Sequence, residues 1–143
     1  MRILRLHLQN VHALRNQWTI QFDQFPLYEA GLFAITGPTG GGKSSLLDAM
    51  IVALYGRVPR YGHNTPTELM TRHTAETLIE LDFAVQQGRF RARWNLRRAR
   101  GQATGRVQPA RHELQNLDTN QTLDLRSSDV PKEVEKLTGL NME

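Results

Sequence analysis

Eight consecutive residues in the first third of the chain form a phosphate-binding pattern. The run Gly37-Pro38-Thr39-Gly40-Gly41-Gly42-Lys43-Ser44 matches G-x-x-x-x-G-K-[ST]. Its glycines let successive backbone N–H groups point at an anion, and a helix that starts there adds partial positive charge. In this pattern Lys43 reaches the β and γ phosphates and the Ser44 hydroxyl ligates Mg²⁺. We therefore predict a nucleoside triphosphate site over residues 37–45, with Ser45 as its last member.

The segments on either side of this pattern suit the task of positioning it. Leu32, Phe33, Ala34 and Ile35 run without alternation, which is typical of a strand buried on both faces. From Ser44 the apolar spacing becomes helical up to Gly56, which can end a helix. Because this helix is apolar nearly all round, we predict that it is buried.

The remaining elements follow from alternation and turn signals. Strands are predicted around residues 4–8 and 18–22, and an antiparallel hairpin over 75–85 and 89–94. A loop separates the central helix from this hairpin, with one short helical turn at 67–70. A strand at 110–117, a turn at 118–121 and a helix at about 129–137, ended by Gly139, complete the chain. The order predicts an α/β fold, a P-loop unit with an adjoining antiparallel sheet.

Arginine is concentrated in one part of the chain. Eight arginines lie between Arg89 and Arg111, and no acidic residue interrupts the gap from Asp82 to Glu113. For the strand residues Arg89, Arg91 and Arg93 we expect a solvated face paired with Glu76, Glu80 and Asp82. For the loop residues, which have no nearby acid in sequence, contact with nucleic acid phosphates is the alternative; these residues are Arg97, Arg98, Arg100 and Arg106.

Composition excludes several other classes of protein. The chain carries a net charge of +4, has no cysteine and has a pI near 10.0, which favours an anionic partner and a reducing compartment. No apolar run approaches the roughly 18 residues that a membrane helix needs. The five histidines show no metal-ligand spacing and are expected on the surface or in loops, and Asp48 is expected to be a structural partner. Asp82 is interpreted as a surface residue, so no carboxylate for Mg²⁺ is evident.

Three stretches resemble one family. The segment GLFAITGPTGGGKSSLLDAMIVALYGRVPR is similar to the N-terminal P-loop segment of SbcC, in the structural-maintenance-of-chromosomes-like family of DNA repair ATPases. The segment MRILRLHLQNVHALRNQWTIQF resembles the opening strands of that family, and ELMTRHTAETLIELDFAV resembles its strand after the P-loop helix. The likeness extends over all 143 residues in order.

The resemblance implies an ABC-type ATPase head whose two lobes are separated by a long coiled coil. Residues 1–143 would be the N-terminal lobe, truncated before the glutamine loop and the coiled coil. Asn10 and Arg15 lie in the loop that approaches the nucleotide in this family. The implied cofactors are ATP and Mg²⁺. The implied partners are the chain's own C-terminal lobe, a second head in a homodimer, an SbcD-like nuclease subunit and double-stranded DNA, in the cytoplasm and without a membrane.

The same resemblance predicts a head that couples ATP binding and hydrolysis to the processing of double-strand DNA ends by a partner nuclease. The isolated chain is expected to be inactive, because the catalytic residues would lie in the other lobe. Two alternatives stay open at this point: a small P-loop kinase, and a nucleotide or nucleic acid binding module without turnover.

Overall fold

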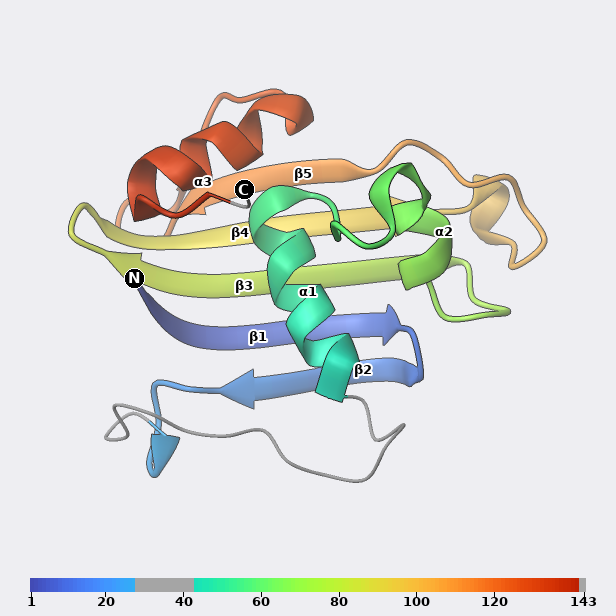
Figure 1. Ribbon diagram of the computed structural model, residues 1–143, viewed down its shortest axis with the longest axis horizontal. Coiled ribbons are helices and arrows are strands. Elements are labelled where there is room, and N and C mark those ends of the chain that lie inside the picture. Colours follow the sequence, from blue (N-terminus) through green and yellow to red (C-terminus); the bar gives the residue numbers. More distant parts are fainter. Residues whose placement is uncertain (28–42, 142–143) are drawn as a thin grey trace.

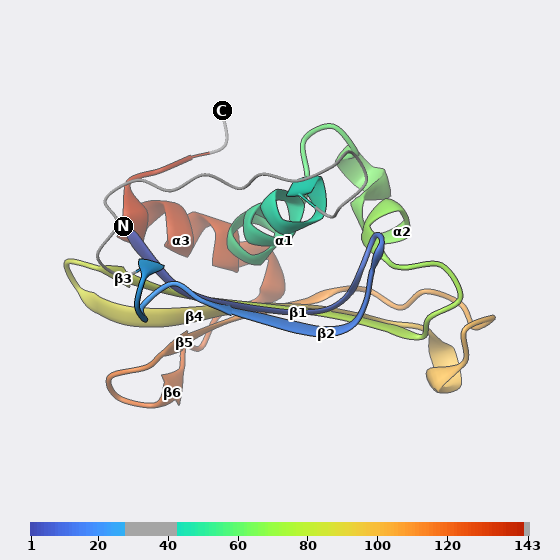
Figure 2. The same ribbon diagram turned by 90° about the horizontal axis from the view of Figure 1, so that it is seen from below.

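The computed structural model describes residues 1–27 and 43–141, apart from the side chains of Asn64 and Thr67. The predicted strand at 32–35 and the glycine-rich loop from Gly37 to Gly42 therefore lie outside the described residues. Within the described part, one antiparallel sheet carries helices on one of its faces (Figures 1 and 2).

The sheet has six strands in the order β2-β1-β3-β4-β5-β6. In chain order they are β1 (Arg2–Val11), β2 (Leu14–Gln21), β3 (Glu76–Val85), β4 (Gly88–Arg97), β5 (Arg111–Asn116) and β6 (Gln121–Thr122). Each neighbouring pair is antiparallel. The strands predicted within the described ranges are thus confirmed, and the short strand β6 replaces part of the predicted turn at 118–121.

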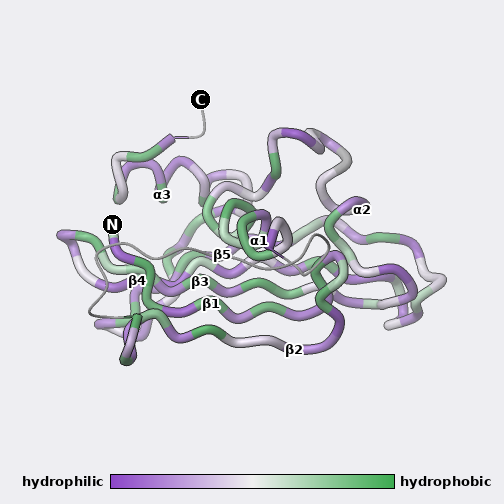
Figure 3. Tube along the Cα trace, turned by 60° about the horizontal axis from the view of Figure 1, so that its bottom comes forward, coloured by the Kyte–Doolittle hydropathy of each residue, from purple (hydrophilic) through white to green (hydrophobic). Residues whose placement is uncertain are grey.

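Alternation sets which face of each strand is buried. Leu6 and Leu8 of β1 pair with Leu81 and Ile79 of β3, and all four side chains are buried on the face that carries the helices. Phe90, Ala92, Trp94 and Leu96 extend this apolar face along β4. The alternation of hydrophobic and hydrophilic residues is visible along the strands in Figure 3. The opposite face carries the charged residues of β3 and β4.

Helix α1 (Lys43–Tyr55) crosses this apolar face over β1, β3 and β4 (Figure 1). Its buried side includes Ala49, Val52 and Ala53, which recur at helical spacing and are small enough for close contact with the sheet. The helix ends at Gly56, whose φ of 76° is left-handed and whose N–H bonds to the carbonyl of Val52 at 2.8 Å. The predicted burial of this helix holds for the side that faces the sheet and fails on the outer side, where Leu47 is 54% exposed.

Helix α3 (Val130–Thr138) packs beside α1 on the same face (Figure 2). Val130 and Val134 are buried, one helical turn apart, and Gly139 ends the helix with a φ of 71°. The short helix α2 (Thr65–Leu69) lies at one end of the sheet and directly follows the 3₁₀ turn Gly62–Asn64. Two more short 3₁₀ turns, Ala99–Gly101 and Ser127–Asp129, follow β4 and precede α3. No helix in the described ranges is long and apolar enough to cross a membrane.

Candidate nucleotide and phosphate site

The last residues of the phosphate-binding pattern form the first turn of α1. Lys43 is partly buried, Ser44 is exposed and Ser45 is buried. A lysine and a serine at a helix start have the positions that the pattern requires for a phosphate and a metal ligand. The glycine-rich part, Gly37 to Gly42 with Pro38 and Thr39, lies outside the described residues. The first turn is therefore in place, and the nucleotide roles of all these residues remain a prediction.

Magnesium would find one protein ligand at this turn, the Ser44 hydroxyl. In the described ranges there is no cluster of three or more His, Asp or Glu side chains that could hold a metal. The carboxylate of Asp48 lies one helical turn further along α1, and it already accepts hydrogen bonds from His12 and Arg60. A single hydroxyl fits the usual state of protein-bound Mg²⁺, which keeps several waters and binds substrate phosphates.

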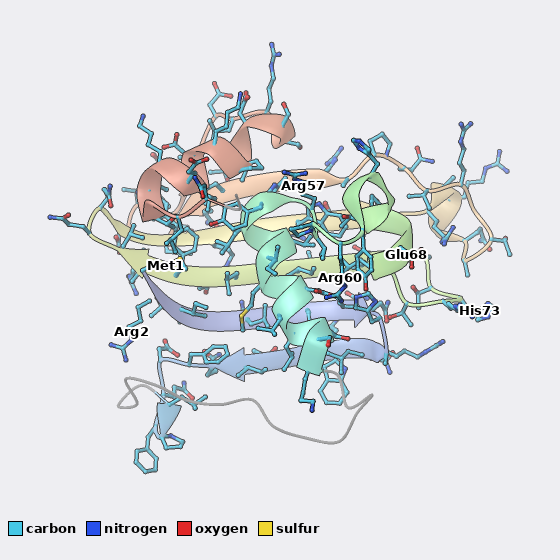
Figure 4. The ribbon with its side chains drawn as sticks, in the orientation of Figure 1. Met1, Arg2, Arg57, Arg60, Glu68 and His73 are labelled. Atoms are coloured by element: carbon cyan, nitrogen blue, oxygen red, sulfur yellow. The ribbon has the colours of Figure 1, made fainter. Side chains whose placement is uncertain are left out.

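Asp48 is the centre of a polar cluster beneath the second turn of α1. Its side chain is buried, and Oδ2 accepts hydrogen bonds from His12 Nε2 at 2.9 Å and from Arg60 Nη2. Arg60 also donates to the Tyr61 hydroxyl at 3.1 Å, and its guanidinium lies 4.7 Å from the centre of the Tyr61 ring. Figure 4 shows Arg60 beside α1.

The cluster joins the P-loop helix to two other segments. His12 comes from the turn between β1 and β2 and has a left-handed φ of 49°, whereas Arg60 comes from the loop that follows α1. The prediction that Asp48 is a structural partner is confirmed by these bonds. Sequence reasoning missed its partners, because nothing in the spacing of His12 and Arg60 relates them to Asp48.

Asn10, one of the two predicted loop residues near the nucleotide, has its side chain bonded within the chain. Its Nδ2 donates to the carbonyl of Glu76 at 2.9 Å, and its Oδ1 accepts from the N–H of Asn16 at 2.8 Å. The backbone carbonyl of Asn10 accepts from the Thr77 hydroxyl at 2.9 Å. The observed contacts of Asn10 stabilise the end of β1, and its contact with nucleotide stays a prediction.

Arg15, the other loop residue, lies on an exposed part of β2 near the turn. Its Nη2 donates to the backbone carbonyl of Arg72 at 3.1 Å. Arg15 and Arg72 both line an open hollow of about 580 Å³ at this end of the sheet. None of the described residues that line this hollow belongs to the first turn of α1, which lies over β2 in Figure 1.

The structure separates the four loop arginines that the sequence grouped. Arg97 lies 3.4 Å from the Glu76 carboxylate, so the expectation of no nearby acid was wrong for this residue. Arg98 donates from Nε to the carbonyl of Thr74 at 3.2 Å and from Nη1 to the carbonyl of Gly105 at 3.1 Å. Arg100 and Arg106 are exposed. Antiparallel pairing causes the difference, because it places Glu76 directly opposite Arg97.

The interpretation of Asp82 as a surface residue was wrong. It is only 7% exposed, and its two oxygens accept from Nε and Nη2 of Arg91 at 2.7 and 2.9 Å. This bidentate pair raises the pKa of Arg91 through the hydrogen bonds to Asp82. The predicted pairing of strand arginines with Asp82 is confirmed for Arg91, whereas Arg89 pairs with Asp118 at 2.9 Å.

His112 corrects the expectation that histidines lie on the surface or in loops. It is 4% exposed on β5, and its Nε2 donates to the carbonyl of Ala53 at 2.7 Å. Burial lowers its pKa, with the bond to Ala53 acting in the opposite direction. Its place in the alternation of β5, opposite Trp94, was the signal that pointed to the core.

A family model described as an AAA domain matches residues 5–137. The chain belongs to the AAA domain family. This AAA domain is 39% identical over 159 residues to the SbcC subunit of the SbcCD nuclease of Pseudomonas aeruginosa, an alignment that covers 99% of the chain and 13% of that relative. The SbcC subunit of Bacillus subtilis is 36% identical over 145 residues, covering 100% of the chain and 12% of that relative. The resemblance to the SbcC family is confirmed.

More distant matches extend the comparison to fold. A probable DNA double-strand break repair Rad50 ATPase of Aquifex aeolicus is 28% identical over 142 residues, covering 99% of the chain and 13% of that relative. The structure of the SMC head domain from Thermotoga maritima aligns with a TM-score of 0.58 at 17% identity, over 93% of this chain and 42% of that one. This likeness supports the predicted P-loop head fold. The chain spans about an eighth of the length of the curated relatives, 13% in the first case.

Proposed function

We propose that this chain is the ATP-binding N-terminal half of the head of a DNA repair ATPase. The observation that carries the proposal is the end of a G-x-x-x-x-G-K-S pattern, Lys43-Ser44, in the first turn of a helix held against a sheet. The family match and the relatives named as SbcC subunits and as a Rad50 ATPase support the same function.

Each residue of the site has a defined task in this function. Lys43 binds the β and γ phosphates, and the N–H groups of the loop and of the first turn orient them. Ser44 supplies one hydroxyl ligand, and Mg²⁺, when bound, neutralises charge that develops on the phosphates. Asp48 holds the β1–β2 turn against the P-loop helix through its bond to His12.

Turnover requires more groups than the described residues supply. Phosphoryl transfer depends on positioning and on charge stabilisation, and an acid for Mg²⁺ and a group to position water are both needed. In our proposal a C-terminal lobe and a second head provide them. The assembled head then acts in the cytoplasm with an SbcD-like nuclease subunit on the ends of double-stranded DNA.

The test combines binding and turnover. We expect the purified chain to bind ATP in a Mg²⁺-dependent way by calorimetry and to show no appreciable hydrolysis. Lys43→Ala should reduce the affinity by about tenfold or more, because a charged hydrogen bond to phosphate contributes about 1.5–3 kcal/mol.

Mixing the chain with the C-terminal region of the native protein should then restore hydrolysis. Phosphorylation of a metabolite by the chain alone would favour the P-loop kinase instead. ATP binding that is unchanged in Lys43→Ala would contradict the proposed nucleotide site.

A further inference from the structure

Three segments that are distant in sequence meet at one end of the sheet. The β1–β2 turn, the connection from α2 to β3 and the loop after β4 lie together at this end in Figure 1. Backbone hydrogen bonds join them: His12 N–H to Leu69 O at 2.8 Å, and Arg98 N–H to Ala75 O at 2.8 Å. The antiparallel order dictates this meeting, because β1 and β4 end where β3 begins.

These three segments concentrate positive charge. Over residues 12–16, 65–76 and 97–107 they contain six arginines and two glutamates. The glutamates are Glu68 and Glu76, and Glu76 pairs with Arg97. Figure 4 shows Glu68 and His73 at this end of the molecule. The excess of cations exists only in the folded chain, since other elements separate the three segments along the sequence.

Two of these arginines are held by neutral groups. Arg15 donates to the carbonyl of Arg72, and Arg98 donates to the carbonyls of Thr74 and Gly105. No carboxylate in the described part of the chain forms an ion pair with either residue. A carbonyl fixes a guanidinium without cancelling its charge, and several of the five N–H donors stay available. Arg91, by contrast, is neutralised by the bidentate contact with Asp82.

A hollow lies between these fixed cations. It has a volume of about 580 Å³ and is lined by His12, Arg15, Glu68, Met70, Thr71, Arg72 and Arg98. Arg15, Arg72 and Glu68 are exposed, so a large ligand has access to them. Thr71 is not a free donor to a ligand, because its hydroxyl donates to the carbonyl of His12 at 2.7 Å.

We propose that this hollow binds a phosphate group of the DNA backbone, with Arg15, Arg72 and Arg98 as its donors. The inference rests on the proposed function, in which the substrate is double-stranded DNA. Guanidinium groups match phosphate oxygens in planar, paired geometry, and such contacts carry affinity without sequence information. Glu68 is the acidic residue that lines the hollow. Its carboxylate repels a bound phosphate and therefore lowers the affinity for DNA.

The experiment measures the binding of two short DNA duplexes of unrelated sequence to the chain over a range of salt concentrations. Arg15→Gln and Arg72→Gln should each weaken both duplexes equally, by about tenfold, and flatten the slope of log K against log salt by roughly 0.9. Glutamine keeps an N–H donor, so the bond from position 15 to the carbonyl of Arg72 can persist. Arg98 is left intact, because its two carbonyl bonds hold the loop.

Two further variants make the test specific. Glu68→Gln should tighten DNA binding severalfold, which a general loss of structure cannot do. Arg126→Gln, at an exposed arginine on the segment that leads into α3, is the matched control with the same change of charge, and it should leave affinity and slope nearly unchanged.

Several results overturn the inference. The first is a wild-type chain that does not bind DNA at low salt. The second is a slope of log K against log salt that is unchanged in Arg72→Gln. The third is a loss of DNA affinity that is equal in Arg72→Gln and Arg126→Gln. Inorganic tripolyphosphate and ATP are titrated in parallel. If Arg72→Gln weakens these ligands and not DNA, the hollow belongs to the nucleotide site. Failure of the proposed function shows separately, as ATP binding that is insensitive to Lys43→Ala.

Discussion

The imidazole of His112 links β5 to the end of helix α1. Because a carbonyl oxygen only accepts hydrogen bonds, Nε2 must be the donor in the 2.7 Å contact with the carbonyl of Ala53. This carbonyl is one of the last four of α1, which have no partner within the helix. Burial favours the neutral ring and lowers the pKa of His112 from its ordinary value of 6.5. The His112 side chain therefore holds the helix against the sheet, and protonation of its ring would weaken that contact.

We predict that the free energy of unfolding falls as the pH drops below the pKa of an ordinary histidine. The folded pKa is depressed, so the unfolded state takes up the proton first, and the stabilisation present at neutral pH is lost on acidification. Urea unfolding between about pH 7.5 and pH 5 should show a shallower pH dependence for His112→Gln than for the wild type. His63→Gln, at an exposed position in the 3₁₀ turn Gly62–Asn64, is the control. Equal slopes for the wild type and His112→Gln would contradict the buried neutral ring.

Helix ends in this fold depend on two glycines in left-handed conformation. Gly56 ends α1 with a φ of 76°, and Gly139 ends α3 with a φ of 71°. A Cβ at Gly56 would lie 3.3 Å from His112 Nδ1, whereas a Cβ at Gly139 would have nothing within 4 Å. The two positions therefore share backbone strain and differ in packing.

The pair of alanine variants separates these two effects. Gly139→Ala should cost about 1 kcal/mol, the strain of an L-residue in this region, and Gly56→Ala should cost about 2 kcal/mol because the tight contact with His112 is added. Chemical denaturation of both variants measures the difference. Equal costs would mean that the imidazole shifts freely, and would weaken the view of His112 as a fixed link.

Across the molecule, the helices cover one face of the sheet and leave the outer side of α1 uncovered by the other described elements. Leu47 on that side is 54% exposed, and Trp18 on the edge strand β2 is 52% exposed. We expect the C-terminal lobe that the proposed function requires to cover this side of α1. Exposed apolar area of this kind favours association.

We therefore predict that the isolated chain self-associates as its concentration rises. Leu47→Gln should reduce that association in sedimentation velocity and change the free energy of unfolding by less than about 0.5 kcal/mol, because the side chain is mostly solvated already. Leu137→Gln, at a partly buried position packed against the core, should instead lower stability. A chain that stays monomeric at all concentrations would argue that the domain needs no further lobe.

Elements with local signals could be predicted from the amino-acid sequence alone. Alternation identified β1, β3 and β4, because a strand with one buried face repeats every two residues. The helical spacing after Ser44 and the glycines at 56 and 139 located α1 and α3 to within one or two residues. The phosphate-binding pattern and the family resemblance were also readable there, since both consist of residue types at short, fixed spacing.

The partners of the charged side chains emerged only from the folded chain. Strand register placed Asp82 against Arg91 and Glu76 against Arg97. A shift of β4 by one residue relative to β3 would have moved its side chains to the opposite face and given each of them a different partner. The contact of Asp48 with His12 and Arg60 joins three separate segments. The six arginines at one end of the sheet likewise come together through the antiparallel order of the strands. Such pairings depend on long-range packing, in which each partner is set by the whole fold and no local pattern records it.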